Sequence, residues 1–179
     1  MILRETPLAG AYVVELEPAL DERGHFARTF DSEQFAALGL DPRVAQTSTS
    51  FSARSGTLRG MHYQADPHGE AKLVRVTRGS VYDVIIDLRR ESATFRGWFA
   101  LELDASGSSS LYVPVGFAHG FQTLSDDAEV NYQMSYPYVP EAARGVRFDD
   151  PAFAIEWPAA PLGGRLLSER DRTFADFEF

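Results

Sequence analysis

Short runs in which apolar and polar residues alternate dominate this chain. In residues 80–88, Val81 and Ile85 lie on one face with Asp83 and Asp87, and the residues between them lie on the other. Because side chains along a strand point alternately to its two faces, a period of two predicts β-strands. Further strands are expected at residues 57–64, 99–103, 111–113, 117–124 and 129–136. Many short strands between glycine, proline and serine turns favour an antiparallel sandwich or barrel.

One helix is predicted at residues 31–39. Asp31 or Ser32 can cap its start, Gln34 stands where a capping box requires an acid or amide, and Gly39 can end it. The part of the chain from residue 137 onwards is rich in proline and aromatic residues and is expected to be irregular, with a short helical turn near residue 168. No repeat or linker is visible, so residues 1–179 are interpreted as one domain.

Composition excludes several classes of protein. The 179 residues include no cysteine, which excludes disulfides, thiolate zinc sites and cysteine nucleophiles and fits a reducing compartment. With 17 basic and 26 acidic residues the formal charge is −9, which disfavours nucleic-acid binding. The first ten residues lack a secretory pattern and no apolar run could span a membrane, so a cytoplasmic protein is expected. An anionic ligand would need a local basic cluster, for which the candidates are Arg23, Arg59, Lys72 and Arg170.

Candidate chemistry rests on four histidines, since imidazole exchanges protons near neutral pH. His62 and His119 lie in polar, glycine-containing segments, although either could equally be a hydrogen-bonded packing residue. If residues 57–64 form a strand, Arg59 faces away from His62. On residues 129–136, Tyr132 shares a face with Val130, Met134 and Tyr136. An inward His62 and an inward Tyr132 on different strands could flank a ligand.

Ordered motifs along nearly the whole chain resemble the dTDP-4-dehydrorhamnose 3,5-epimerase family. The central motif is Gly56-Thr57-Leu58-Arg59-Gly60-Met61-His62-Tyr63-Gln64, followed by Ala71-Lys72-Leu73-Val74-Arg75-Val76. Later motifs are Asp83-Val84, Asp87-Leu88-Arg89, Gly116-Phe117-Ala118-His119-Gly120-Phe121, Asp149-Asp150-Pro151 and Leu167-Ser168-Glu169-Arg170-Asp171. An early one is Asp21-Glu22-Arg23-Gly24-His25-Phe26.

This resemblance implies an all-β, cupin-like antiparallel jelly roll with a few short helices. It also implies a homodimer with exchanged N-terminal strands and a nucleotide-sugar substrate, with no metal and no cofactor. By position, His62 is the base, Asp171 its carboxylate partner, Tyr132 the acid on the opposite face of the sugar, and Lys72 the residue near the enolate oxygen. The residues implied to bind substrate are Arg23, Phe26, Gln46, Arg59, His119, Tyr138 and Arg170.

The implied chemistry is proton abstraction next to a ketone. A 4-keto sugar loses a proton from C3 or C5 to His62, Lys72 opposes the charge on the enolate oxygen, and Tyr132 returns a proton from the other face. The sequence departs from the family pattern at Met61, Ser48, Glu70, Gln133 and Arg170. These departures leave open which nucleotide and deoxysugar are used, and whether one centre or both are inverted. An epimerase that inverts a single centre of a CDP- or GDP-linked keto-sugar is therefore an alternative.

Three other functions stay open. A metal-dependent cupin would need two histidines one residue apart, a glutamate and a third histidine, whereas this chain reads His62-Tyr63-Gln64 and offers only Glu70 and His119 besides. A 3,4-ketoisomerase would use the same barrel and the same proton-transfer logic. A non-catalytic sugar-binding cupin would have no need for a paired base and acid.

Overall fold

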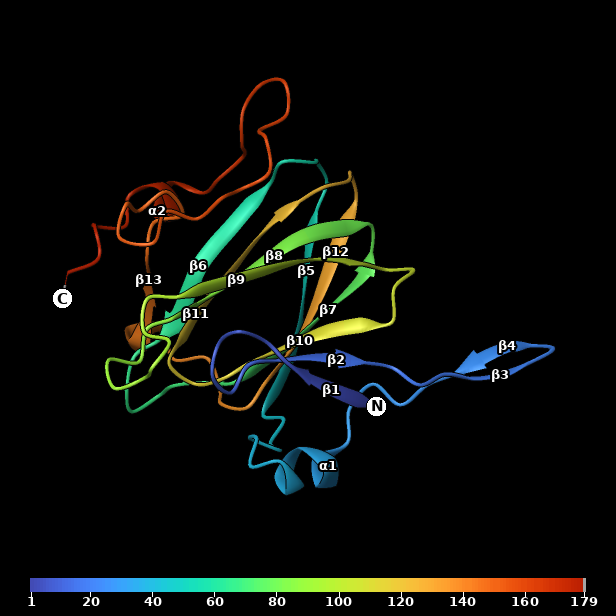
Figure 1. Cartoon of the computed structure of the whole chain (residues 1–179). Coiled ribbons are helices and arrows are strands. Elements are labelled where there is room, and N and C mark those ends of the chain that lie inside the picture. Colours follow the sequence, from blue (N-terminus) through green and yellow to red (C-terminus); the bar gives the residue numbers. More distant parts are fainter. Residues whose placement is uncertain (179) are drawn as a thin grey trace.

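The computed structural model of the chain describes residues 1–178 and consists of two antiparallel sheets packed face to face (Figure 1). The six-stranded sheet has the order β1 (Ile2–Glu5), β2 (Tyr12–Glu15), β10 (Ser109–Val113), β7 (Lys72–Arg78), β12 (Ala128–Met134), β5 (Gln46–Ser52). The five-stranded sheet has the order β13 (Ala143–Gly145), β6 (Leu58–Gln64), β11 (Phe117–Thr123), β8 (Ser80–Asp87), β9 (Trp98–Asp104). Neighbours distant in sequence, such as β2 with β10, give the jelly roll.

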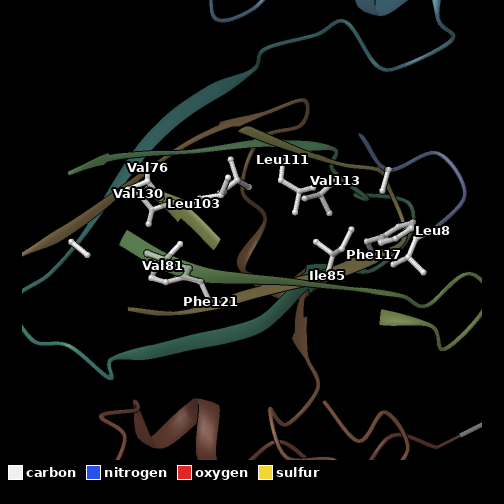
Figure 2. Close-up of a cluster of buried hydrophobic side chains, with 13 residues drawn as sticks. Leu8, Val76, Val81, Ile85, Leu103, Leu111, Val113, Phe117, Phe121 and Val130 are labelled. Atoms are coloured by element: carbon white, nitrogen blue, oxygen red, sulfur yellow. The ribbon is translucent and has the colours of Figure 1, made fainter. Parts of the chain in front are cut away.

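The main core fills the space between the two sheets. Val81 and Ile85 of β8 point inward, as their alternation predicts, and belong to one buried cluster with Val76, Val130 and other side chains of the six-stranded sheet (Figure 2). The opposite face of the five-stranded sheet is also apolar, with Val84 buried under the C-terminal part of the chain. Since both faces of this sheet exclude water, its strands give a rigid wall for any side chain mounted on them.

Short elements complete the fold. They are the hairpin of β3 (Ala19–Asp21) and β4 (Gly24–Phe26), the helix α1 (Ser32–Ala37), the 3-10 turn η1 (Pro140–Ala142) and the helix α2 (Glu169–Arg172). The hairpin projects from the body of the molecule on the side away from α2 (Figure 1). Both α-helices are short, and within residues 1–178 no helix has the length and apolar character that crossing a bilayer requires.

The helix α1 matches its prediction except in one detail. The Asp31 carboxylate accepts hydrogen bonds from the amides of Glu33 and Gln34, and Gly39 adopts a φ of +71° just after the helix. The side-chain amide of Gln34 does not complete a capping box, because it donates to the carbonyl of Met1 at 2.9 Å. Gln34 therefore ties the helix to the first strand.

A β-bulge interrupts the regular alternation of side chains along β6. His119 pairs with His62 and Phe121 pairs with Arg59, so between these pairs the single residue Gly120 of β11 faces two residues of β6, Gly60 and Met61. Gly60 at the bulge has a φ of +137°, and a Cβ placed there would come within 2.5 Å of the Cα of Gly120. Only glycine permits this close approach of the two backbones.

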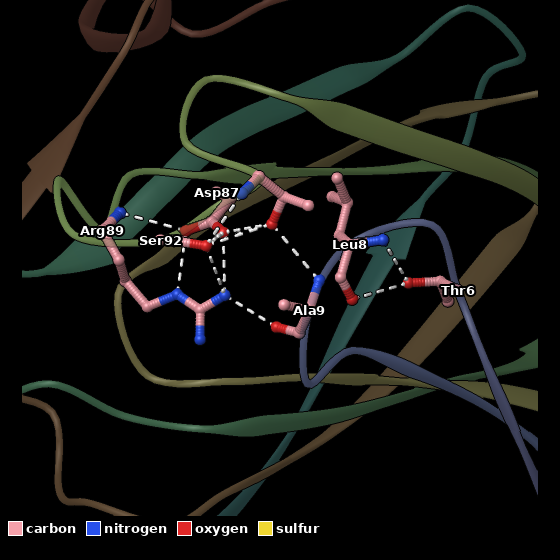
Figure 3. A network of polar contacts seen from close by, with 7 residues as sticks. Thr6, Leu8, Ala9, Asp87, Arg89 and Ser92 are labelled. Atoms are coloured by element: carbon pink, nitrogen blue, oxygen red, sulfur yellow. Dashed lines mark hydrogen bonds and ion pairs between the residues drawn. The ribbon is translucent and has the colours of Figure 1, made fainter.

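A polar network fixes the end of β8. Arg89 donates to the Asp87 carboxylate at 2.7 and 2.8 Å and to the carbonyl of Ala9 at 2.7 Å, while the Thr94 hydroxyl donates to Asp87 at 2.7 Å (Figure 3). The amide of Ala9 donates back to Thr94. This network joins the loop after β8 to the loop between β1 and β2.

Candidate active site

A cavity of about 650 Å³ lies at one end of the barrel, within the size range of ligand-binding sites in enzymes. Both sheets contribute to it, and the segment that contains α2 closes one side. The side chains that line it include nine of the eleven predicted site residues, namely Gln46, Arg59, His62, Lys72, His119, Tyr132, Tyr138, Arg170 and Asp171. His62 comes from the five-stranded sheet and Tyr132 from the six-stranded sheet, so the two side chains enter from opposite walls.

His62 and Asp171 form a tight pair although 109 residues separate them in sequence. The distance from His62 Nε2 to Asp171 Oδ1 is 2.7 Å, and Asp171 is only 4% exposed. Burial opposes ionisation of Asp171, but its hydrogen bond and charge interaction with His62, together with the amide of Gly60, outweigh burial and lower its pKa. The ionised carboxylate accepts a hydrogen bond from the N–H of Nε2. In neutral His62 the other nitrogen, Nδ1, then carries no proton and is the basic one.

The local fold explains why Asp171 is ordered. The hydroxyl of Ser168 caps α2 by accepting a hydrogen bond from the Asp171 amide at 3.1 Å. The backbone of residues 57 and 58 pairs with Leu166, two residues before the cap. The C-terminal segment is therefore fastened to β6, the strand that carries His62.

Lys72 is held beside His62 by a second carboxylate. Its Nζ lies 3.2 Å from Glu70 Oε1 and 3.4 Å from the backbone oxygen of His62. Glu70 Oε2 in turn accepts a hydrogen bond from the Gln64 side chain at 3.1 Å. Both charged side chains are about 10% exposed, at 11% and 10%. An ammonium has three donors, so one remains to face an oxygen atom of a ligand.

Tyr132 stands beside another histidine–aspartate pair. The rings of His119 and Tyr132 meet edge to face with centroids 6.0 Å apart, and His119 Nε2 lies 2.9 Å from Asp83 Oδ1. Burial first, and the charge of Asp83 second, raise the pKa of Tyr132 far above its ordinary value, against smaller opposing effects of Ser50 and Arg59. The phenol therefore stays protonated at neutral pH and can donate a proton.

The outer part of the cavity is more open and more basic. Gln46 and Tyr138 are linked there by a 2.8 Å hydrogen bond from the Tyr138 amide to Gln46 Oε1. Arg59 donates to the Ser52 hydroxyl at 3.1 Å and to a neighbouring backbone oxygen, which directs its guanidinium along β5. Arg170 lines the opposite side, on the exposed face of α2. Such an arrangement suits an anionic group such as a diphosphate.

Comparison with known proteins shows to which family this chain belongs. The family model described as dTDP-4-dehydrorhamnose 3,5-epimerase matches residues 5–178. A dTDP-4-dehydrorhamnose 3,5-epimerase of Methanothermobacter thermautotrophicus is 42% identical over 171 residues, which are 95% of this chain and 91% of that protein. This chain belongs to the dTDP-4-dehydrorhamnose 3,5-epimerase family.

Solved structures of this family agree with the fold. The crystal structure of a dTDP-4-dehydrorhamnose 3,5-epimerase from Elizabethkingia anophelis has a TM-score of 0.95 at 39% identity and covers 99% of this chain and 96% of that one. The structure of dTDP-6-deoxy-D-glucose-3,5-epimerase from Legionella pneumophila in complex with dTDP-4-keto-L-rhamnose has a TM-score of 0.87 at 34% identity and covers 95% and 89%. The predicted all-β, cupin-like jelly roll is confirmed.

Two residues expected at the site from the family resemblance lie outside the cavity in the single chain. Arg23 and Phe26 belong to the projecting hairpin, where the Arg23 side chain is 85% exposed and paired with Asp21. Phe26 is 75% exposed. Of the four residues suggested for a basic cluster, the fold therefore gathers Arg59, Lys72 and Arg170 but not Arg23.

The predicted orientation of Arg59 is wrong. Strict alternation along residues 57–64 places Arg59 and His62 on opposite faces, yet both line the cavity. The bulge at Gly60 inserts one extra residue and turns Arg59 to the same side as His62. A glycine within a strand pattern is the sequence signal for such a bulge.

Sequence reasoning did not select two carboxylates of the site, Asp83 and Glu70, as functional residues. Asp83 falls at an inward position of β8 in a strongly apolar strand, so a charge there signals a buried partner. Glu70 follows a turn and has no local pattern to distinguish it. Within residues 1–178 no three histidine, cysteine, aspartate or glutamate side chains are grouped so that they could hold a metal ion.

Proposed function

We propose that this protein inverts C3, C5 or both in a nucleotide-linked 4-keto-6-deoxyhexose of the dTDP-4-dehydro-6-deoxyglucose type. One observation carries the proposal: a histidine–carboxylate pair and a protonated phenol enter a single sugar-sized cavity from opposite walls. The names of the family relatives and the dTDP-sugar bound to the Legionella enzyme support the same substrate class.

The geometry accounts for each step of an inversion. His62 removes the proton from the carbon next to the ketone, and Asp171 stabilises the imidazolium that forms. The free donor of Lys72 opposes the charge that develops on the ketone oxygen, where a preorganised cation acts without reorganisation. Tyr132 then protonates the same carbon from the other wall. Because the two groups act on opposite faces, the centre is inverted.

The rest of the cavity would bind the nucleotide. Gln46 and Tyr138 line the cavity together with Arg59 and Arg170, and the two arginines would bind the diphosphate. His119 would contact the sugar from the same wall as Arg59. Remote binding of this kind holds the reacting carbon between base and acid, which is where most of the rate gain from positioning arises.

We further propose that the active form is a homodimer in which the partner's hairpin reaches this cavity. A hairpin with strands of three residues is too small to be stable alone, yet it exposes Leu20 at 79% and Phe26 at 75%. Exchange between subunits would cover these apolar side chains and bring Arg23 to the nucleotide. Light scattering after gel filtration tests this, with a monomeric mass as the contrary result.

We also propose that the protein is a single-domain, cytoplasmic enzyme that uses no cofactor. The absence of cysteine among 179 residues suits a reducing compartment, and the charge of −9 does not favour nucleic acid as a ligand. Neither general base nor general acid chemistry at a carbon next to a ketone requires a redox group.

Incubation with dTDP-4-keto-6-deoxyglucose in deuterated water, followed by NMR, tests the proposed function. We expect deuterium at C3, C5 or both, because the returned proton comes from a group that exchanges with solvent. The Tyr132→Phe variant keeps the ring but removes the acid and should strongly reduce inversion. A protein that binds the keto-sugar without any label would be a binding module, and a 3-keto product would indicate a ketoisomerase.

A further inference from the structure

Each inversion in the proposed function leaves two groups in the wrong protonation state. His62 has gained the proton that left the substrate, and Tyr132 has lost the proton that entered from the other face. Before another centre is inverted, His62 must lose a proton and Tyr132 must gain one. The His62 side chain is 41% exposed and can release its proton to water. Tyr132 needs a neighbour that can supply a proton inside the cavity wall.

The neighbours of Tyr132 differ in their ability to do this. The Asp83 carboxylate and the His119 ring are 0% and 4% exposed and bind one another, so this pair is almost completely shielded from bulk water. The Arg59 guanidinium uses two of its five N–H donors on Ser52 and a backbone oxygen, and it has no acceptor atom through which a proton could be passed. These three groups can stabilise charge on the phenol but cannot pass a proton from solvent.

Ser50 is a further neighbour of Tyr132, and its position is different. It lies on β5, the edge strand of the six-stranded sheet, diagonally across from Tyr132 on the cavity face, since Ser48 is the residue paired with Tyr132. The Ser50 hydroxyl interacts with the phenol and favours its ionised form, as a donor does. Gln46 and Ser48 continue the same polar row to the exposed end of the cavity.

We propose that Ser50 is a positioning residue that relays a proton from water to Tyr132 between inversions. Its hydroxyl donates to the Tyr132 phenolate while its oxygen accepts a proton from water in the row beside Ser48. The water regains a proton from the pool into which His62 releases its own. The sum transfers one proton from protonated His62 to ionised Tyr132, and Ser50 is unchanged. This inference rests on the proposed function.

Rapid-quench kinetics with dTDP-4-keto-6-deoxyglucose in deuterated water test the relay. In Ser50→Ala the first inversion should proceed at the wild-type rate, because Tyr132 starts protonated. It should stop after about one equivalent per active site and give way to steady-state turnover about tenfold slower or more, the scale of a lost proton-transfer group. A defect in folding or binding would instead slow the first inversion as well.

Two further variants make the result specific. Ser50→Thr retains a hydroxyl and suits a strand, so it should restore steady turnover without a burst. Thr49→Ala removes a hydroxyl from the outward face of the same strand and should behave as the wild type. Wild-type turnover without a burst in Ser50→Ala would overturn the relay alone. Absence of deuterium in the wild-type product would overturn the proposed function and the relay with it.

Discussion

Two histidine–aspartate pairs share this cavity, and they differ in burial. His62 and Asp171 are 2.7 Å apart, and the His62 side chain is 41% exposed. His119 and Asp83 are 2.9 Å apart, and their side chains are 4% and 0% exposed. The same pair of residue types therefore occurs once with access to water and once without it.

Burial decides what each pair can do. A base that works repeatedly must return its proton to solvent, which the exposed ring of His62 permits. The buried pair instead acts as a fixed charge next to Tyr132, where Asp83 raises the pKa of the phenol after the larger effect of burial itself. The environment of each pair therefore decides what chemistry the pair can perform. Variants of His62, Asp171 and Asp83 test this difference.

His62→Ala should have the largest effect on rate. Removal of the proposed base should lower kcat by about 10²- to 10⁴-fold, the usual contribution of general acid–base catalysis. His68→Ala is a matched control, because His68 bonds to Tyr136 outside the cavity. NMR of deuterium uptake measures both. Nearly normal deuterium uptake by His62→Ala would mean that His119, and not His62, acts as the base.

Asp171→Asn should have the next largest effect. The amide oxygen can still accept from Nε2, but the charge that stabilises the imidazolium is lost, so kcat should fall by about a hundredfold while KM changes little. Asp176→Asn is the matched control in the same segment, since Asp176 is 65% exposed and pairs with Arg147. Equal losses in both variants would mean that the C-terminal segment, and not the charge, matters.

The part of this comparison that sequence predicts is the set of residues, not their environments. The motifs select His62, Tyr132 and Asp171, and the family resemblance assigns their roles. Asp83 is paired with His119, 36 residues further along the chain, and no local pattern identifies that partner. The pairing of Glu70 with Lys72 likewise depends on Gln64, which a turn brings alongside.

The strands of the fold likewise fall into those that the sequence predicts and those that it does not. Strands in which the alternation is visible in the sequence, such as β8 and β9, are predicted nearly to their ends. The strand β5, Gln-Thr-Ser-Thr-Ser-Phe-Ser, is not predicted, because one face lines a polar cavity and the other meets solvent. The strand β7 is not predicted either, since Leu73 and Val74 are buried on opposite faces and hide the alternation.

Asp83→Asn should change the pH dependence of catalysis more than its maximum rate. One Asp83 oxygen accepts from His119, and among residues 1–178 the other has no hydrogen-bond partner, so the amide fits with little loss. Loss of the negative charge should lower the pKa of Tyr132, although burial still keeps it above its ordinary value.

The pH profile of kcat/KM checks this expectation. Ionised Tyr132 cannot donate, so the basic limb of the profile should move to lower pH in Asp83→Asn, with less than about a tenfold change at neutral pH. Asp171→Asn provides the contrast, because it acts on the base and should leave the Tyr132 limb in place. An unchanged basic limb in Asp83→Asn would show that the buried pair does not control the acid.

Asp87→Asn should have the smallest effect on rate, and it tests whether any buried aspartate of the barrel matters for catalysis. Asp87 is completely buried like Asp83, but neither it nor its partners Arg89, Ser92 and Thr94 are among the residues that line the cavity. Burial opposes ionisation there, yet these hydrogen bonds outweigh it and lower the pKa of Asp87 from 3.8 to about 2. Activity at neutral pH should match the wild type once the variant is folded.

Stability is where Asp87→Asn should act. Because the folded pKa is depressed, the ionised carboxylate stabilises the fold fully above pH 3.8, by about 2 kcal/mol, and this stabilisation is lost as the pH falls towards about 2. Urea unfolding at pH 7 should show that loss in the variant, and the difference from wild type should shrink between pH 4 and pH 3. Glu91→Gln, an exposed change in the same loop, is the control. A difference that stays constant with pH would mean that the network stabilises through packing and not through the charge of Asp87.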